Sequence, residues 1–259
     1  MYRFLLTPRW MALHAVMIIA LLVCLVLGWW QFGVYENSRD RQDVRDEPAV
    51  AVSELAQPGE PLGDARERPA VAEGRYLAEQ QRLVPGRVHD NVLGSYVVTP
   101  LRLEDGMVVP VLRGWVDDAD GAAATAVPPG PVTVEGHLLP PETSEHATVR
   151  RGQVLEPGQV AYIAPGRLAE RAGVPERTAL RGYLLLGAES PAPTAAPQPL
   201  GIDEVAPIRD VSPWQNLSYW AQWWVFGLAA VVFWASIVRS GVRTRKREIN
   251  APAVSHAPS

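Results

Sequence analysis

Apolar residues gather in two long blocks, one near each end of the chain. The first block, 11–32, contains 22 residues without a formal charge, and the second, 219–238, contains 20. In an α-helix these blocks extend about 33 Å and about 30 Å, enough to cross the hydrocarbon core of a bilayer. The pattern therefore predicts two transmembrane helices, at residues 11–32 and 219–238.

The first apolar block does not have the features of a cleavable signal peptide. A signal peptide has an apolar region of about 7–15 residues that ends at a small-residue cleavage site. The block here is longer, and the polar sequence Glu36-Asn37-Ser38-Arg39 follows it. A lipoprotein anchor does not fit either, because Cys24 lies in mid-block without a small residue before it. We interpret Cys24 as a packed or lipid-facing thiol.

Cationic residues flank both blocks on the side of the chain termini. Arg3 and Arg9 precede the first block, and five cations follow the second, at positions 239, 243, 245, 246 and 247. Arg and Lys near the ends of a span favour the cytoplasmic side. We therefore predict a multi-pass membrane protein whose two termini are cytoplasmic and whose central residues are extracytoplasmic.

The segment between the spans changes character at residue 70. Residues 33–69 are polar and predict a linker with one helical turn near Ser53–Ala56. Residues 70–189 contain apolar runs of strand length bounded by Gly and Pro, which predicts a β-rich domain. Residues 190–218 are Pro-rich and predict an extended return linker, while 1–10 and 239–259 form the cytoplasmic N-terminus and the basic tail. The predicted strands are 70–77, 82–88, 95–103, 107–116, 132–139 and 180–186.

Turn chemistry refines the predicted fold of this domain. Glu104-Asp105-Gly106 separates two strand runs and is typical of a tight hairpin. A short helix is expected over 167–172, closed by Gly173 and followed by Pro175. Six strands, one helix and many Pro breaks predict a mainly antiparallel domain that resembles a barrel or a sandwich. The predicted fold class is thus a membrane protein in which two transmembrane helices flank an extracytoplasmic β domain.

Composition excludes several kinds of chemistry. The net charge of −4 combines basic ends with an acidic middle, which argues against binding of nucleic acid. The single cysteine leaves no intramolecular disulfide and no Cys-based zinc or iron–sulfur site. The five histidines form no metal-binding pair, and no nucleophile elbow, P-loop or zinc-protease motif occurs. The sequence therefore does not support an enzyme.

Candidate functional residues lie near the ends of the spans. Eight of the nine tryptophans lie in or close to a span, six of them at the predicted outer boundary. They fit an interfacial aromatic belt, or a face for a partner or an apolar cofactor. Gln31 and Gln222 lie at similar depth, so they either hydrogen-bond across the two helices or face a ligand. His14 is an ionisable residue inside the first span, about one turn from its cytoplasmic end.

In a series of short motifs the chain resembles the Surfeit locus protein 1 family. The first span ends in Gly28-Trp29-Trp30-Gln31, where the family has Gly-x-Trp-Gln, although Val34 replaces an Arg that commonly follows. Arg113-Gly114-Trp115-Val116 matches the family's Arg-Gly-Trp-Val at the end of an apolar strand. Further matches are Gly74-Arg75-Tyr76, the run 94–101, Val134-Glu135-Gly136, and 219–223 at the start of the second span.

This resemblance implies an assembly factor for an aa3-type cytochrome c oxidase in a bacterial plasma membrane. The implied role is to assist insertion of haem a, held transiently, into the catalytic subunit, or to stabilise that subunit meanwhile. The implied partners are the catalytic subunit or a respiratory supercomplex, together with membrane lipid. The implied cofactor or partner face comprises Trp30, Gln31, Asn216, Tyr219, Gln222 and Trp223. The implied partner-binding residues are Gly28, Arg113, Gly114 and Trp115.

One departure from the family pattern keeps other functions open. Asn216 stands where many members carry a His that is proposed to hold haem, and Asn is a poor haem ligand. Either another residue takes this role, or the protein does not ligate haem iron. The departure makes a permanently bound accessory subunit of the oxidase a second hypothesis. A membrane-tethered envelope binding module, unrelated to respiration, is the third.

Overall fold

The computed structural model describes residues 3–149, 154–208 and 213–250. The chain forms two compact units. We call residues 1–40 together with 209–259 the helical unit, and Arg41–Ile208 the β domain. Each unit is described by itself.

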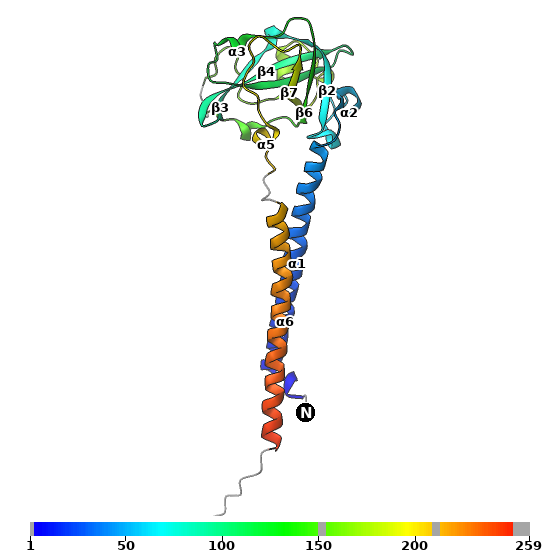
Figure 1. The fold of residues 1–259 in the computed structure, drawn as a ribbon, viewed down its shortest axis with the longest axis vertical. Coiled ribbons are helices and arrows are strands. Elements are labelled where there is room, and N and C mark those ends of the chain that lie inside the picture. Colours follow the sequence, from blue (N-terminus) through cyan, green and yellow to red (C-terminus); the bar gives the residue numbers. More distant parts are fainter. Residues whose placement is uncertain (1–2, 150–153, 209–212, 251–259) are drawn as a thin grey trace, which may run out of the picture. The chain divides into compact units, whose positions relative to one another are not determined.

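Two long helices form most of the helical unit (Figure 1). Helix α1 runs over Pro8–Arg45 and helix α6 over Pro213–Asn250, and a short turn, η1 (Arg3–Leu6), precedes α1. Both helices are long and apolar enough to cross a membrane, as the two apolar blocks predict. Both extend beyond those blocks, because the sequence has no proline between Pro8 and Pro48 or between Pro213 and Pro252.

The β domain is built on a sheet of seven strands. Six of them correspond to the predicted runs, and the seventh, β1, has two residues, too few for a periodic signal. The last strand begins three residues later than predicted and continues into a polar stretch. The strands are β1 (Val50–Ala51), β2 (Pro69–Tyr76), β3 (Arg82–His89), β4 (Val92–Leu103), β5 (Val108–Val116), β6 (Pro131–Leu139) and β7 (Tyr183–Ser190).

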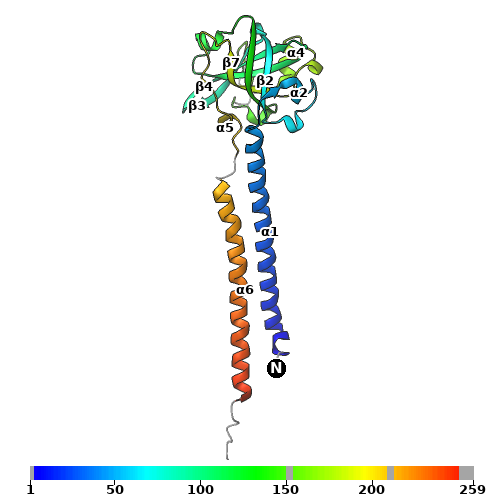
Figure 2. The same cartoon turned by 45° about the vertical axis from the view of Figure 1, so that its right-hand side comes forward.

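Pairing between β2 and β4 closes the sheet into a barrel (Figure 2). The sheet order is β1-β2-β6-β7-β5-β4-β3, so five strands form a ring while β1 and β3 are added outside it. Pairing is antiparallel except for β1–β2 and β5–β7. At the closure, a Cβ atom on Gly74 would lie 2.3 Å from the carbonyl oxygen of Arg102. Only glycine allows the two strands to approach this closely, which explains the Gly in this motif.

Apolar side chains are buried on both faces of the barrel strands. One core cluster receives side chains from all five ring strands, including Val109 and Val111, and therefore fills the barrel. A second cluster lies outside the ring, where Leu112 and Leu185 pack with helix α4 (Pro165–Arg171). Consequently all nine residues of β5 are buried. This two-sided burial explains why β5 appears in the sequence as a continuous apolar run.

Short helical segments connect and cover the strands. Helix α4 corresponds to the helix predicted over 167–172, and α2 to the single turn expected near Ser53–Ala56. The Pro-rich return segment also packs against the domain, because Gln198 exchanges backbone hydrogen bonds with Trp115 and Leu200 is buried. The remaining segments are α2 (Val52–Leu55), α3 (Ala122–Thr125), α5 (Ile202–Val205), η2 (Gly63–Ala65), η3 (Ala78–Gln80), η4 (Ser144–His146) and η5 (Glu176–Thr178).

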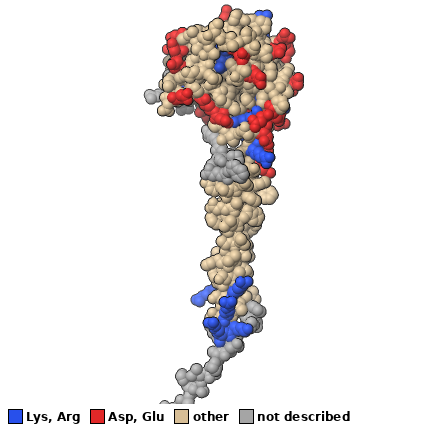
Figure 3. Space-filling view, viewed as in Figure 1, with Lys and Arg blue, Asp and Glu red and all other residues tan. Residues whose placement is uncertain are grey.

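Charge is distributed differently in the two units. Figure 3 shows Arg and Lys side chains gathered toward the C-terminal end of α6, while Asp and Glu are spread over the β domain. The cations follow the apolar part of α6, where they can remain in contact with water and lipid headgroups. The surface thus keeps the asymmetry of basic ends and an acidic middle that the sequence contains.

The hairpin formed by β3 and β4 is fastened to helix α5. Asp90 and Asn91 form its turn with φ values of 46° and 66°, typical of a type I′ turn. Next to the turn, Nδ1 of His89 is hydrogen-bonded to a carboxylate oxygen of Glu204 in α5. The imidazole ring of His89 also packs against the indole of Trp115, with ring centroids 5.4 Å apart.

The His89–Glu204 contact predicts a pH-dependent contribution to stability. Hydrogen bonding to Glu204 raises the pKa of His89 above its ordinary value, with desolvation opposing and nearby carboxylates adding to the effect. Because the folded pKa is the higher one, the contribution is complete below the unfolded pKa of about 6.5. It is lost as pH rises through the folded pKa.

We therefore expect His89→Gln to lower the unfolding temperature of the detergent-solubilised chain more at about pH 5.5 than at about pH 8.5. Scanning calorimetry at the two pH values measures this difference. Equal losses at both would show that the ionic contact does not contribute.

Candidate functional site

Helices α1 and α6 pack along a stripe of residues spaced three or four apart. The residues of α6 that contact α1 include Trp220, Trp223, Gly227 and Trp234. Trp223 fills the space next to Gly28 of α1: its Cβ atom lies 3.6 Å from the position that a Cβ atom on Gly28 would take. Small residues at such positions let two helices approach closely in a membrane. Gly28, which the sequence assigns to partner binding, is therefore buried in the contact between the helices.

An apolar groove runs between the two helices. It has a volume of about 290 Å³, and its lining includes Trp223 and Trp224 of α6 and Cys24 of α1. Cys24 is half-buried, in agreement with a packed or lipid-facing thiol. The other lining residues are Leu21, Leu25, Gly227, Leu228 and Val231. The groove can accept an apolar group and offers it almost no polar contact.

Exposed aromatic side chains lie near the C-terminal end of the apolar part of α1 and near the start of the apolar part of α6, and one of them, Trp224, lines the groove. Trp30 is 63% exposed, and Trp29, Tyr219 and Trp224 are exposed as well. We call Trp29, Trp30, Tyr219 and Trp224 the aromatic rim. Phe32 packs against Trp220 between the helices and connects the two halves of the rim. Aromatic side chains of this kind are suited to an interface with lipid headgroups or to a partner.

The two glutamines and Asn216 have different surroundings. Gln31 is half-buried, whereas Gln222 is exposed and lies off the stripe of α6 that contacts α1. Both alternatives for Gln31 and Gln222, a hydrogen bond across the helices or a face toward a ligand, stay predictions. Asn216 belongs to the first turn of α6, and its side chain lies outside the described residues.

His14 lies near the N-terminal end of the apolar part of α1, where it contacts Trp234 near the C-terminal end of the apolar part of α6. Nε1–H of Trp234 donates a hydrogen bond of 2.9 Å to Nδ1 of His14, and the two rings meet edge to face. A hydrogen bond between helices satisfies a polar group that would otherwise be costly in lipid. The contact accounts for a histidine inside the span without a ligand.

Arg113 is buried in the β domain. Its side chain has no exposed surface, and it follows Val109 and Val111 on the face of β5 that points into the barrel. Nη1 donates a 2.8 Å hydrogen bond to the carbonyl oxygen of Ala126, and Nη2 lies 3.6 Å from a carboxylate oxygen of Glu189. The resemblance implies that Arg113 binds a partner, but its side chain has no exposed surface for a direct contact.

Tyr76 completes this internal cluster. The guanidinium of Arg113 lies over its ring, 5.2 Å from the centroid, and Glu189 is the second charged neighbour. Desolvation and the nearby Glu189 carboxylate raise the pKa of Tyr76 far above its ordinary value, so the phenol remains protonated. Among the described protein groups, the Tyr76 hydroxyl, one Glu189 oxygen and two Arg113 nitrogens have no hydrogen-bond partner. The cluster is therefore costly to bury and depends on the Arg113–Glu189 attraction.

Gly114 and Trp115 are structural as well. Gly114 has a φ of 144°, and a Cβ there would lie 2.3 Å from the carbonyl oxygen of Gln198, so no other residue fits without a shift. Trp115 is buried, and its Nε1–H donates a 2.9 Å hydrogen bond to the carbonyl oxygen of Arg87. The Arg-Gly-Trp motif thus joins β5 to the return segment and to β3, instead of forming an exposed docking surface.

An ion-pair network holds the end of α1 in the β domain. Arg45 is 5% exposed, and its Nε donates to Glu67 and its Nη1 to Asp203, each at 2.7 Å. Its Nη2 donates to the carbonyl oxygen of Ala206, and Arg41 binds the other oxygen of Glu67. The sequence contains no local signal for this network, because the partners of Arg45 lie 22 to 161 positions away from it along the chain. An arginine in a predicted polar linker gives no signal of burial.

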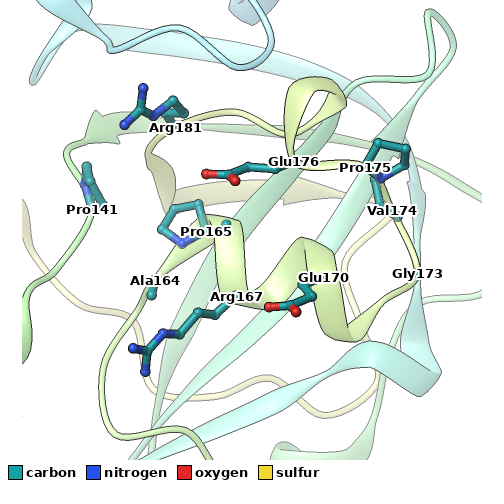
Figure 4. A pocket seen from close by; sticks show the side chains of 11 residues that line it. Pro141, Ala164, Pro165, Arg167, Glu170, Gly173, Val174, Pro175, Glu176 and Arg181 are labelled. Carbon is teal, nitrogen blue, oxygen red and sulfur yellow. The ribbon is translucent and has the colours of Figure 1, made fainter.

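A cleft in the β domain was also not predicted (Figure 4). It has a volume of about 770 Å³ and lies beside α4. Its charged lining residues, Arg167, Glu170, Glu176 and Arg181, are balanced in sign. The described residues contain no group of three or more His, Cys, Asp or Glu side chains able to hold a metal ion. The cleft therefore offers no chemistry that selects one class of ligand.

The burial of Arg113 predicts a large effect of removing its charge. Arg113→Met leaves the Glu189 carboxylate buried without a counter-ion, and we expect a loss of about 3–5 kcal/mol in the free energy of unfolding. Glu189→Gln combined with Arg113→Met should recover most of that loss, because neither charge then remains. Chemical unfolding of the two variants measures this. A single Arg113→Met variant as stable as the unmodified chain would contradict the assignment.

The Arg45 network predicts unequal effects of two neighbouring arginines. Arg45→Ala removes a buried guanidinium from three partners and should lower the unfolding free energy by about 3 kcal/mol. Arg41→Ala is the matched control, since that side chain is one third exposed and shares a single partner. Its expected loss is about 1 kcal/mol or less. Equal losses, measured by chemical unfolding, would rule out the special role of Arg45.

Comparison with known proteins gives a consistent relationship over nearly the whole chain. The SURF1 family model matches residues 18–228. An uncharacterised SURF1-like protein of Mycobacterium bovis is 31% identical over 253 residues, which is 95% of this chain and 89% of the relative. Uncharacterised SURF1-like proteins from two strains of Mycobacterium tuberculosis, CDC 1551 and H37Rv, match with the same identity and coverage.

Proposed function

Since this chain belongs to the SURF1 family, we propose that it is an assembly factor for an aa3-type cytochrome c oxidase. In this proposal it assists insertion of haem a into the catalytic subunit, or stabilises that subunit until the haem is in place. The observation that carries the proposal is an exposed aromatic rim, together with an apolar groove, on two helices that are long and apolar enough to cross a membrane. Such a face suits an apolar cofactor or an unfilled membrane subunit.

The groove suits the apolar part of a cofactor better than it suits the cofactor's iron. Its volume of about 290 Å³ is at the lower limit of ligand pockets, so it holds part of a haem while the rim covers the rest. When bound, haem a would supply the redox centre of the oxidase and no chemistry in this chain. Haem iron is ligated in proteins by His, Cys, Met or Tyr. Asn216 is none of these, and His14 already accepts a hydrogen bond from Trp234.

The residues of this chain therefore act by packing and shielding. Trp30, Tyr219 and Trp224 present exposed rings that exclude lipid from an apolar partner surface. Trp223 and Gly28 hold the two helices at the separation that the groove requires. Gln31 and Gln222 supply amides near the rim for the polar edge of the cofactor or of the partner.

The distribution of charge supports a membrane orientation. The cations after the apolar part of α6, together with Arg9, support a cytoplasmic location for both termini in a bacterium. The acidic β domain then lies on the extracytoplasmic side of the plasma membrane, where the proposed partner is the outward part of the oxidase.

Asn216 favours a second candidate function, a permanently bound accessory subunit of the oxidase. A protein that does not ligate haem iron has no need to leave once the haem is inserted. The two functions differ in stoichiometry, because an assembly factor leaves the mature enzyme and a subunit remains at about one copy for each enzyme.

Deletion of the gene provides the first test. We expect membranes from the deletion strain to lose most of the a-type haem signal in a reduced-minus-oxidised spectrum, with the b- and c-type signals kept. The b- and c-type signals are kept because the proposed role concerns haem a of the oxidase and no other haem. An unchanged a-type signal would contradict an essential role in haem a insertion.

Substitution in the aromatic rim tests the proposed face. Trp30→Ala should lower the a-type haem signal several-fold, because it removes a largely exposed aromatic ring from the proposed face. Val26→Ala is the matched control, since Val26 lies one turn earlier on α1 and is equally exposed. Immunoblots of the membranes check that both variants accumulate normally. The same signal in both variants would exclude Trp30 from the face.

A further inference from the structure

The tip of the β3–β4 hairpin exposes apolar side chains. Val88, Val92 and Leu93 are 58%, 49% and 68% exposed, and all three lie within three residues of the turn. In the described part of the β domain, the other exposed large apolar residue is Val154. Single exposed apolar residues are ordinary, but a cluster on one hairpin marks an interaction site.

Strand register makes two of these residues, Val88 and Leu93, a continuous surface. Val88 pairs with Leu93 across the hairpin, and His89 pairs with Val92. Directly paired residues on neighbouring strands share a face, so the side chains of Val88 and Leu93 lie next to each other. His89 points to the opposite face, where it contacts Trp115 and Glu204. The apolar pair therefore points away from the core of the domain.

The hairpin is held in place before any partner binds. The type I′ turn fixes its end, the His89–Glu204 hydrogen bond ties it to α5, and Trp115 donates to the carbonyl oxygen of Arg87. A surface that is already ordered loses little conformational entropy on binding, which raises its affinity for a partner. These contacts distinguish the hairpin from an ordinary mobile loop tip.

Among the residues that the structure describes, the exposed charged groups around the tip are acidic. Asp90 in the turn is almost fully exposed, and Asp203 and Glu204 lie in the adjoining helix α5. Two described cations nearby, Arg45 and Arg87, are buried in ion pairs with Glu67 and Glu142 respectively. Anionic lipid headgroups would be repelled by such a rim, whereas Lys or Arg on a protein would be attracted.

We propose that Val88, Asp90 and Leu93 form a docking surface for a protein partner that presents an apolar depression bordered by Lys or Arg. The identity of this partner rests on the proposed function, under which it is the extracytoplasmic part of the oxidase. The apolar side chains supply affinity, while Asp90 orients the partner through its basic border.

Photo-crosslinking in native membranes tests the docking surface. A benzophenone amino acid replaces Leu93 in the full chain, and in a matched control it replaces Val154, an exposed apolar residue outside the hairpin. We expect an oxidase subunit to be crosslinked from position 93 and not from position 154. Crosslinks only to lipid, only to a second copy of this chain, the same products from both positions, or no product would each overturn the proposal.

Substitution gives an independent measurement. Leu93→Ser should lower recovery of oxidase with the affinity-tagged chain about tenfold or more, because burial of a leucine is typically worth more than 1.4 kcal/mol. Asp90→Lys should also lower it, through repulsion from the basic border, while Val154→Ser should leave it unchanged. Recovery that is unaffected by Leu93→Ser and Asp90→Lys would overturn the proposal.

The proposed function can fail without the docking surface failing. An unchanged a-type haem signal in the deletion strain would exclude a role in haem a insertion. A protein crosslinked from position 93 would then still support docking, provided that Asp90→Lys abolishes its crosslink and Val154→Ser does not. A crosslinked protein that is insensitive to Asp90→Lys would contradict the docking surface itself.

Discussion

The buried guanidinium of Arg45 connects the segment through which the chain enters the β domain to the segment through which it leaves. It binds Glu67 before β2, and Asp203 and the carbonyl oxygen of Ala206 near the end of the domain. The planar fork of arginine suits this arrangement, since it presents several donors in fixed directions. Through α5, the same network extends to His89 and the β3–β4 hairpin. The order of the hairpin thus depends on contacts made where the chain enters and leaves the domain.

Two-sided burial of the barrel strands explains the role of the Arg-Gly-Trp motif. β5 has one face in the barrel and the other under α4, so its polar residue must find partners inside the domain. Arg113 finds Ala126 and Glu189, Gly114 allows the return segment to approach, and Trp115 reaches β3. The motif acts on function by shaping the domain, while the exposed aromatic rim and hairpin are available to partners.

The sequence predicted elements wherever a local pattern carries the information. The length of the two apolar blocks gave the membrane helices, and Gly, Pro and apolar runs gave six strands. It did not predict that α1 continues to Arg45, because a polar helix without an apolar stripe looks like a linker. The burial of Arg113 was also missed, since its counter-ion Glu189 lies 76 positions away and in a strand that was expected to end at residue 186. The candidate face on the helices came from the resemblance and from aromatic clustering, and it remains a proposal.

The most direct test of an assembly role is the stoichiometry of this chain during maturation of the oxidase. Complexes would be isolated through a tagged catalytic subunit, separated by haem a content, and analysed by quantitative mass spectrometry. An assembly factor is expected at about one copy in complexes that lack haem a and at a small fraction of a copy in the mature enzyme. One copy in the mature enzyme would contradict the assembly role and identify a permanent accessory subunit.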